Sequence, residues 1–261
     1  MKLIDIWDFF VHTSLHYAFA ATLFAFIGAT FLNFKMPLSH YFIIFSMFFF
    51  IATFNRYVDS KEDEINEPER VNFLKSKSYI LVSISVAFLL LSYLLLFYYK
   101  NYKLIGIFSA AFFISYYYNK KLFFISKKLK ELFIIKNVSI SFLFVLLGFA
   151  YPFYLSNASD VTYFIMLSSF FFIRIFINTI TFDIKDIDGD KHAGVITIPV
   201  ILGEEKSKYF LNICNALSGI ILIIWYILEP RSPYFLFLFL PVLMASIYIN
   251  LQSKKFKRTL Q

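Results

Sequence analysis

Long apolar runs separated by short polar segments dominate this sequence. A helix needs about 20 residues to cross the hydrocarbon core of a membrane, and eight runs approach or exceed that length. They cover residues 10–33, 38–56, 78–98, 102–119, 133–154, 161–181, 208–228 and 233–251. The first run begins too late for a signal peptide and lacks a small-residue cleavage site, so we expect it to remain as a span. The pattern predicts an all-α, polytopic transmembrane helix bundle of about eight spans in two four-helix halves.

Composition agrees with this prediction. Hydrophobic residues make up 59% of the chain and charged residues only 16%. A soluble domain of this length needs far more charge to cover its surface, so the excess apolar surface is expected to face lipid. The loops between the runs are too short to hold a soluble domain. We therefore expect one membrane domain over residues 1–261.

The basic residues predict an orientation. Lys35, Lys100, Lys103 and Arg231 lie in the loops that close the first, third and seventh spans, and most other basic residues lie on the opposite side. The positive-inside rule places that second side, with both termini, in the cytoplasm. The net charge of +8 is then explained by topology and by contact with anionic membrane lipid. No basic stripe lies on a soluble surface, so no nucleic-acid partner is expected.

The acidic residues gather in two short windows. Ten of the seventeen lie there: Asp59, Glu62, Asp63, Glu64, Glu67, Glu69, Asp183, Asp186, Asp188 and Asp190. The first window follows the second span and the other follows the sixth, which is the same place in the two predicted halves. Because a cytoplasmic loop normally prefers basic residues, acids at equivalent positions call for a functional reason.

Spacing within the windows suggests that reason. Asn55, Asp59 and Asp63 are four residues apart, so a continued helix would stack them on one face. The repulsion between such carboxylates is relieved by a bound cation. Oxygen ligands without neighbouring histidine or cysteine favour Mg²⁺, with Mn²⁺ as a substitute. The expected metal ligands are Asp59, Asp63, Asp183, Asp186 and Asp190. Spacing alone leaves two interpretations open, a metal–diphosphate site and a solvated acidic loop.

One arginine lies inside an apolar run. Arg174 is part of the sixth span, one turn before Asn178. An ionisable residue within a membrane span indicates a functional site by default. We therefore expect Arg174 to face a cavity.

The full wording of the two windows resembles a known family. The stretch NRYVDSKEDEINEPER over residues 55–70 resembles the first motif of UbiA-type intramembrane prenyltransferases, NxxxDxxxD followed by INxPxR. The stretch DIKDIDGD over 183–190 is similar to the second motif, DxxDxxxD, and GVITIPV over 194–200 to the phrase that follows it. Lys136 and Asn137 match a weaker third landmark.

The resemblance implies a fold and a reaction. It implies helices around a central cavity with cytoplasmic capping loops, and transfer of a prenyl group from a prenyl diphosphate to a lipophilic acceptor, with release of diphosphate. Asp59, Asp63, Asp186 and Asp190 would be catalytic, acting through Mg²⁺. The diphosphate-binding residues would be Asn55, Arg70, Lys120, Lys136, Asn137 and Arg174.

The acceptor stays open. The phrase RPxxxGxxS, frequent after the first motif in the family, is replaced here, and no acceptor-binding signature is evident near the N-terminus. A quinone-precursor ring, an isoprenoid ether lipid, a porphyrin and a chlorin are all compatible with the sequence.

Two other functions compete with this interpretation. A CDP-alcohol phosphotransferase also places aspartates at the end of a membrane helix, but no Ala-Arg pair follows Asp188 and Gly189 at the offset of that family's motif. A transporter with an acidic site generally carries its coupling carboxylates near the bilayer midplane, whereas these acids lie at the ends of spans.

Overall fold

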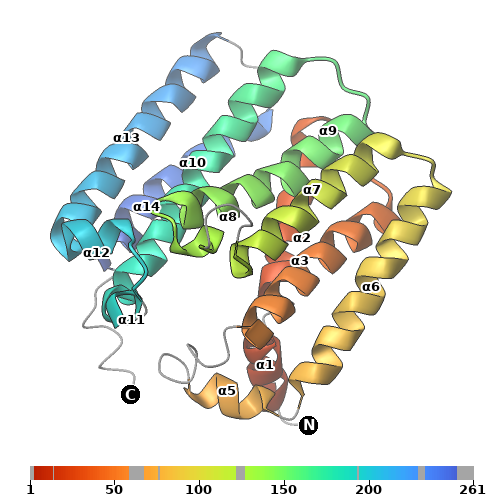
Figure 1. Cartoon of the computed structure of the whole chain (residues 1–261). Helices are drawn as coiled ribbons and strands as arrows, with labels where there is room; N and C mark the ends of the chain where they lie inside the picture. Colours follow the sequence, from red (N-terminus) through yellow and green to blue (C-terminus); the bar gives the residue numbers. More distant parts are fainter. Residues whose placement is uncertain are drawn as a thin grey trace. The chain divides into compact units, whose positions relative to one another are not determined.

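The computed structural model of the chain describes residues 3–13, 15–58, 68–75, 77–121, 127–192, 194–228 and 233–251. Within these ranges the elements are all helical (Figure 1), which confirms the predicted all-α class. Five of the described helices are long and apolar enough to cross a membrane, at Leu38–Val58, Ser78–Tyr98, Ile135–Leu155, Val161–Lys185 and Glu204–Ile227. Shorter apolar helices lie at Leu15–Phe31 and Phe235–Leu251. The protein is a polytopic membrane protein, and the count of eight spans stays a prediction.

The chain divides into two compact units. The first unit contains residues 1–119 and 146–159. Its helices are α1 (Leu3–His12), α2 (Leu15–Phe31), α3 (Leu38–Val58), α5 (Pro68–Leu74), α6 (Ser78–Tyr98), α7 (Tyr102–Asn119), a π-helical turn (Leu146–Ala150) and α9 (Tyr151–Leu155).

The second unit contains residues 120–145 and 160–261. Its helices are a 3₁₀ turn (Leu129–Glu131), α8 (Ile135–Val145), α10 (Val161–Lys185), α11 (Ile187–His192), α12 (Ile198–Leu202), α13 (Glu204–Leu228), a second 3₁₀ turn (Pro233–Leu238) and α14 (Phe239–Leu251). The division follows the predicted halves except at the fifth span, where the helix passes from the second unit to the first at Leu146. The prediction of a single domain stays a prediction.

The first predicted span, 10–33, is wrong in its extent. The structure has two helices there, α1 ending at His12 and α2 beginning at Leu15. Thr13 lies between them in a turn, and its hydroxyl donates to the carbonyl of Phe9 at 2.6 Å. The backbone N–H of Thr13 also donates to the Phe9 carbonyl, at 3.0 Å, so the last turn of α1 closes at Thr13 and α2 starts as a separate helix.

Hydroxyl groups join α3 to α6 in the first unit. The hydroxyl oxygens of Thr53 and Ser85 lie 2.8 Å apart, and those of Ser46 and Ser92 are also 2.8 Å apart. All four side chains are buried. Helices in lipid gain little from hydrophobic burial against each other, so small residues and interhelical hydrogen bonds carry much of their association.

Close backbone contact joins α2 to the π-helical turn. A Cβ atom built on Gly28 would lie 2.1 Å from the carbonyl oxygen of Gly148. A Cβ atom on Gly148 would lie 3.3 Å from the Cβ of Phe24. The two glycines therefore permit a helix approach that a larger residue at position 28 would prevent.

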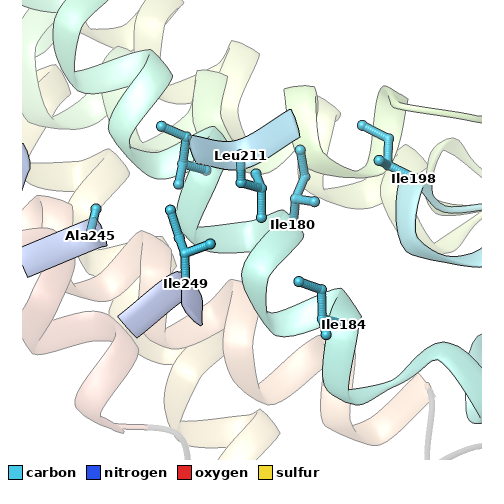
Figure 2. Close-up of a cluster of buried hydrophobic side chains, with 7 residues drawn as sticks. Ile180, Ile184, Ile198, Leu211, Ala245 and Ile249 are labelled. Atoms are coloured by element: carbon cyan, nitrogen blue, oxygen red, sulfur yellow. The ribbon is translucent and has the colours of Figure 1, made fainter. Parts of the chain in front are cut away.

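A buried apolar cluster organises the second unit. Seven residues from α10, α12, α13 and α14 form it: Ile177, Ile180, Ile184, Ile198, Leu211, Ala245 and Ile249. Figure 2 shows Ile180 and Ile184 on α10, with Ile198 approaching from the short helix α12. Ile184 precedes most of the second acidic motif and Ile198 follows it, and both belong to this cluster. The cluster therefore fixes the chain on either side of the motif.

Replacing Gly28 by alanine should destabilise the protein. The added methyl group would collide with the Gly148 carbonyl, and separating the two backbones should cost roughly 1–3 kcal/mol. Gly106→Ala is the matched control, because a Cβ on this helical glycine of α7 meets nothing within 4 Å. Thermal unfolding in detergent should show a lower Tm for Gly28→Ala and an unchanged or higher Tm for Gly106→Ala. Equal melting temperatures for the two variants would contradict the close crossing.

Candidate active site

The second acidic motif lies where α10 ends. Asp183 is buried in the last turn of α10, Asp186 caps its C-terminus, and Asp190 lies on α11. The backbone N–H of Asp190 donates to the carbonyl of Asp186 at 2.8 Å. This bond keeps the two aspartates one helical turn apart even though α10 has ended.

Lys136 brings two of these carboxylates together. Its Nζ lies 2.8 Å from Oδ1 of Asp183 and 3.6 Å from Oδ2 of Asp190. The three side chains are largely buried, with exposed fractions of 20%, 6% and 13% respectively. At this depth the attraction between opposite charges is stronger than in water. The second motif therefore contains a position between two carboxylates that accommodates a positive charge.

Neutral groups complete the surroundings of the two carboxylates. The Asn137 amide donates to Oδ2 of Asp183 at 2.8 Å and also lies 3.2 Å from the hydroxyl of Thr179. The Thr197 hydroxyl donates to Oδ2 of Asp190 at 3.3 Å. Sequence reasoning did not select Thr179 or Thr197, although Thr197 is part of the GVITIPV phrase that marked the motif.

The segment after the motif folds back onto it. The backbone N–H of Val195 donates to the carbonyl of Asp190 at 2.8 Å. Gly194 has a φ of +69°, a backbone conformation that residues with a side chain rarely adopt. The turn at Gly194 places Thr197 beside Asp190, and the next residue, Ile198, is in the apolar cluster.

The environment of Asp190 changes its acidity. The pKa of Asp190 is raised to about 6, first by burial and then by the nearby Asp183 and Asp186 carboxylates. The Lys136 ammonium and the hydrogen bond from Thr197 oppose the rise in this pKa. Asp190 is therefore half-protonated near pH 6, whereas an exposed aspartate is ionised there.

These donors suit a hard divalent cation. Asp183 and Asp190 offer carboxylate oxygens, and Thr197 adds a hydroxyl oxygen next to them. In the part of the chain that the structure describes, no three His, Cys, Asp or Glu side chains form a ready metal site. Mg²⁺ typically uses one or two carboxylates and takes its remaining ligands from water and phosphate oxygens. The described residues fit a magnesium ion that takes its remaining ligands from outside this group of side chains.

The first acidic motif is described only at its beginning. Asn55 lies in the last turn of α3, and the predicted ligands Asp59 and Asp63 lie outside the described residues. Asn119, the last residue of α7, donates a hydrogen bond from its Nδ2 to Oδ1 of Asn55. Asn119 was not selected from the sequence. A polar residue at the end of an apolar run was its only signal.

Arg70 lies on the short helix α5, which is held against α1. The ring of Phe73 on α5 contacts the His12 ring, with 5.0 Å between their centroids, and Lys77 Nζ lies 3.7 Å from the Phe73 centroid. Lys120, the remaining predicted basic residue, is exposed immediately after α7.

Arg174 has a different environment from the predicted one. It is buried, and its guanidinium donates to Oδ1 of Asn215, to the hydroxyl of Ser218 at 3.2 Å and to the carbonyl of Pro241 at 2.7 Å. These groups belong to α13 and α14, and all are neutral. Arg174 also precedes Asp183 by nine residues, about 13 Å along α10. These contacts join α10 to α13 and α14, and the predicted part of Arg174 in diphosphate binding stays a prediction.

Comparison with known proteins decides the family. The sequence profile of the UbiA prenyltransferase family matches residues 14–259, nearly the whole chain. The chain belongs to the UbiA prenyltransferase family. This membership confirms the resemblance carried by the two acidic motifs, and it decides against the phosphotransferase and transporter alternatives. No curated protein sequence matches the chain significantly.

Solved structures of UbiA proteins share its fold. A UbiA homologue from Archaeoglobus fulgidus bound to GPP and Mg²⁺ superposes with a TM-score of 0.66 at 17% identity, over 91% of this chain and 82% of the homologue. The DMAPP and Mg²⁺ complex of that homologue gives the same values. A structure of digeranylgeranylglyceryl phosphate synthase in membranes gives 0.64 at 22% identity, over 97% and 90% of the two chains. These TM-scores and coverages show that this UbiA family member shares the fold of the solved structures.

The acidity of Asp190 predicts a pH-dependent affinity for metal. A protonated carboxyl group binds a cation poorly, so affinity should fall as the pH is lowered through 6. With a pKa of about 6, affinity for Mn²⁺ should drop roughly tenfold between pH 7 and pH 5, as measured by electron paramagnetic resonance on purified protein. Asp190→Asn should bind more weakly at pH 7 and lose this titration. A variant that titrates like the natural protein would show that another group is responsible.

Proposed function

We propose that this membrane prenyltransferase uses Mg²⁺ and both acidic motifs to ionise a prenyl diphosphate and transfer the prenyl group to a lipophilic acceptor. The acceptor would be a quinone-precursor ring or an isoprenoid lipid of the ether type. One observation carries the proposal. At the end of a membrane helix, Asp183 and Asp190 both pair with the ammonium group of Lys136.

The family supports the reaction and the site supports its electrostatics. Two solved UbiA structures hold GPP or DMAPP together with Mg²⁺. In this chain, the paired carboxylates of the second motif form an oxygen-rich, partly buried cluster with a matching positive charge. That arrangement has the charges required to bind a metal-complexed diphosphate.

The proposed reaction breaks one bond and forms another. The bond between the allylic carbon and the diphosphate oxygen breaks, and its electron pair leaves with the diphosphate. A nucleophilic carbon or oxygen of the acceptor then supplies an electron pair to the allylic cation, and the acceptor loses a proton. Bound Mg²⁺ would supply positive charge that stabilises the departing diphosphate.

The chain's own residues would share that task. Lys136 is placed to exchange its carboxylate partners for diphosphate oxygens once a metal takes over the charge of Asp183 and Asp190. The other proposed contributors to diphosphate binding are Asn55, Arg70, Lys120, Asn137 and Arg174. Asp59, Asp63 and Asp186 remain proposed metal ligands, together with Asp183 and Asp190.

Single substitutions in either motif should remove most activity. Asp59→Asn and Asp186→Asn should each lower kcat/KM at least a hundredfold, because lost ligand charge weakens stabilisation of the leaving group by about 3 kcal/mol or more. Folding in detergent should persist, since removing one of several like charges relieves repulsion. Formation of labelled product by purified protein measures the loss, and chelation of divalent metal should abolish turnover.

Acidic residues outside the proposed ligand set provide the controls. Glu69→Gln and Glu205→Gln should retain activity close to that of the natural protein. Equal losses in all four variants would mean that bulk negative charge matters and that the ligand assignment is wrong. Incubation with labelled prenyl diphosphates and a panel of both acceptor classes, with mass analysis of the product, tests the reaction itself. Absence of any prenylated product would overturn the proposal.

The proposed orientation places both motifs on the cytoplasmic side. The basic residues next to the motifs favour this arrangement. Single cysteines at the exposed positions Lys75 and Glu205, in a background with Cys214 replaced by serine, should be labelled only from the cytoplasm. A cysteine at the exposed Ser159 should be labelled only from the outside. Labelling of positions 75 and 205 from opposite faces would separate the two motifs and contradict a joint role.

A further inference from the structure

Asn119 is a buried polar residue to which neither motif assigns a role. Only 1% of its surface is exposed, and its Nδ2 donates to Oδ1 of Asn55, the first residue of the NxxxDxxxD motif. Its own Oδ1 is buried and has no hydrogen-bond partner among the described residues. Burying an unsatisfied amide oxygen costs about 1–3 kcal/mol. The bond to the first residue of the motif is what separates Asn119 from other buried polar side chains of α7 such as Ser115.

Aromatic packing holds the two helices that carry this pair. The rings of Phe50 on α3 and Phe112 on α7 are stacked, with 5.7 Å between their centroids. Phe112 is also stacked on Tyr116 of α7 at 6.4 Å. Stacked rings restrict sliding of α3 along α7. Asn119 follows Tyr116 by less than one turn, so this packing fixes its position along α3, next to Asn55.

The second unit repeats this arrangement with different helices. Asp183 is the first residue of the DxxDxxxD motif, and it accepts a hydrogen bond from the buried Asn137 of α8 at 2.8 Å. In each unit, then, a buried asparagine amide from a neighbouring helix donates to the first residue of the acidic motif. Asn119 ends α7 and Asn137 belongs to the first turn of α8, so the two asparagines flank one connecting segment of the chain.

We propose that Asn119 is a positioning residue for the first motif, an inference that rests on the proposed diphosphate-binding role of Asn55. Its donated hydrogen bond fixes the plane of the Asn55 carboxamide. The remaining oxygen lone pair and the Nδ2 hydrogens of Asn55 then keep one direction for the metal–diphosphate substrate. Partners that orient a binding residue in this way commonly change affinity by 10–100-fold when removed.

Binding of a non-hydrolysable prenyl thiolodiphosphate with Mg²⁺ to the purified full chain tests this role. Asn119→Ala should weaken binding roughly tenfold or more. Asn119→Asp keeps the shape but loses the donor, so it should weaken binding to a similar degree even if the alanine variant folds poorly. The double variant Asn55→Ala/Asn119→Ala should bind no more weakly than Asn55→Ala alone, because the second residue acts through the first.

Ser115→Ala is the matched control. Ser115 is also buried on α7, one turn before Asn119, and its hydroxyl has no described partner. This variant should bind the analogue as the natural protein does. Losses at Asn55 and Asn119 that add, or a lower Tm of Asn119→Ala without weaker binding, would show a purely structural role and overturn the inference. Asp186→Asn separates the two proposals. If this variant retains full binding of the analogue, the proposed function itself fails. If Asp186→Asn loses binding but the Asn119 variants do not, only the positioning role of Asn119 is rejected.

Discussion

The pairing of Lys136 with Asp183 and Asp190 is the interaction on which the second-motif site depends. Carboxylates at the end of an apolar helix are partly removed from water, and their mutual repulsion increases as screening decreases. One ammonium 2.8 Å and 3.6 Å from the two groups offsets both effects. It also keeps one oxygen of each carboxylate near the same positive charge. The raised pKa of Asp190 shows that the offset is incomplete.

The same constraint recurs at several polar groups within the described helices. In the second unit, Arg174 finds three neutral acceptors on α13 and α14. In the first unit, hydroxyl pairs join α3 to α6. An unsatisfied polar group in an apolar medium is costly, so these contacts hold helices that gain little from apolar burial against each other. The asparagine amides that bond to Asn55 and Asp183 combine this structural role with the positioning of site residues.

Much of the candidate site was accessible from the sequence because its residues lie at fixed spacing. The one-turn separation of Asp186 and Asp190 follows from their spacing of four residues, and the prediction of a hard metal ion follows from the carboxylate oxygens of the two motifs. Thr197 and Asn119 were missed because their role comes from contact with residues distant in the chain or across a turn. The partners of Arg174 were hidden for the same reason. Its place in a membrane span marked it as unusual, but only the structure shows that its guanidinium bonds to α13 and α14.

The sequence by itself determined the membrane class, most helix positions and the two motifs. Hydrophobic length and local spacing are properties of consecutive residues, and lipid leaves an apolar segment little choice but to form a helix. Tertiary structure alone decided where the first predicted span breaks, how closely α2 approaches the π-helical turn, and which groups bond to each acidic residue. Those outcomes depend on side chains far apart in the chain competing for the same partners. Hydropathy and spacing along the chain contain no record of that competition.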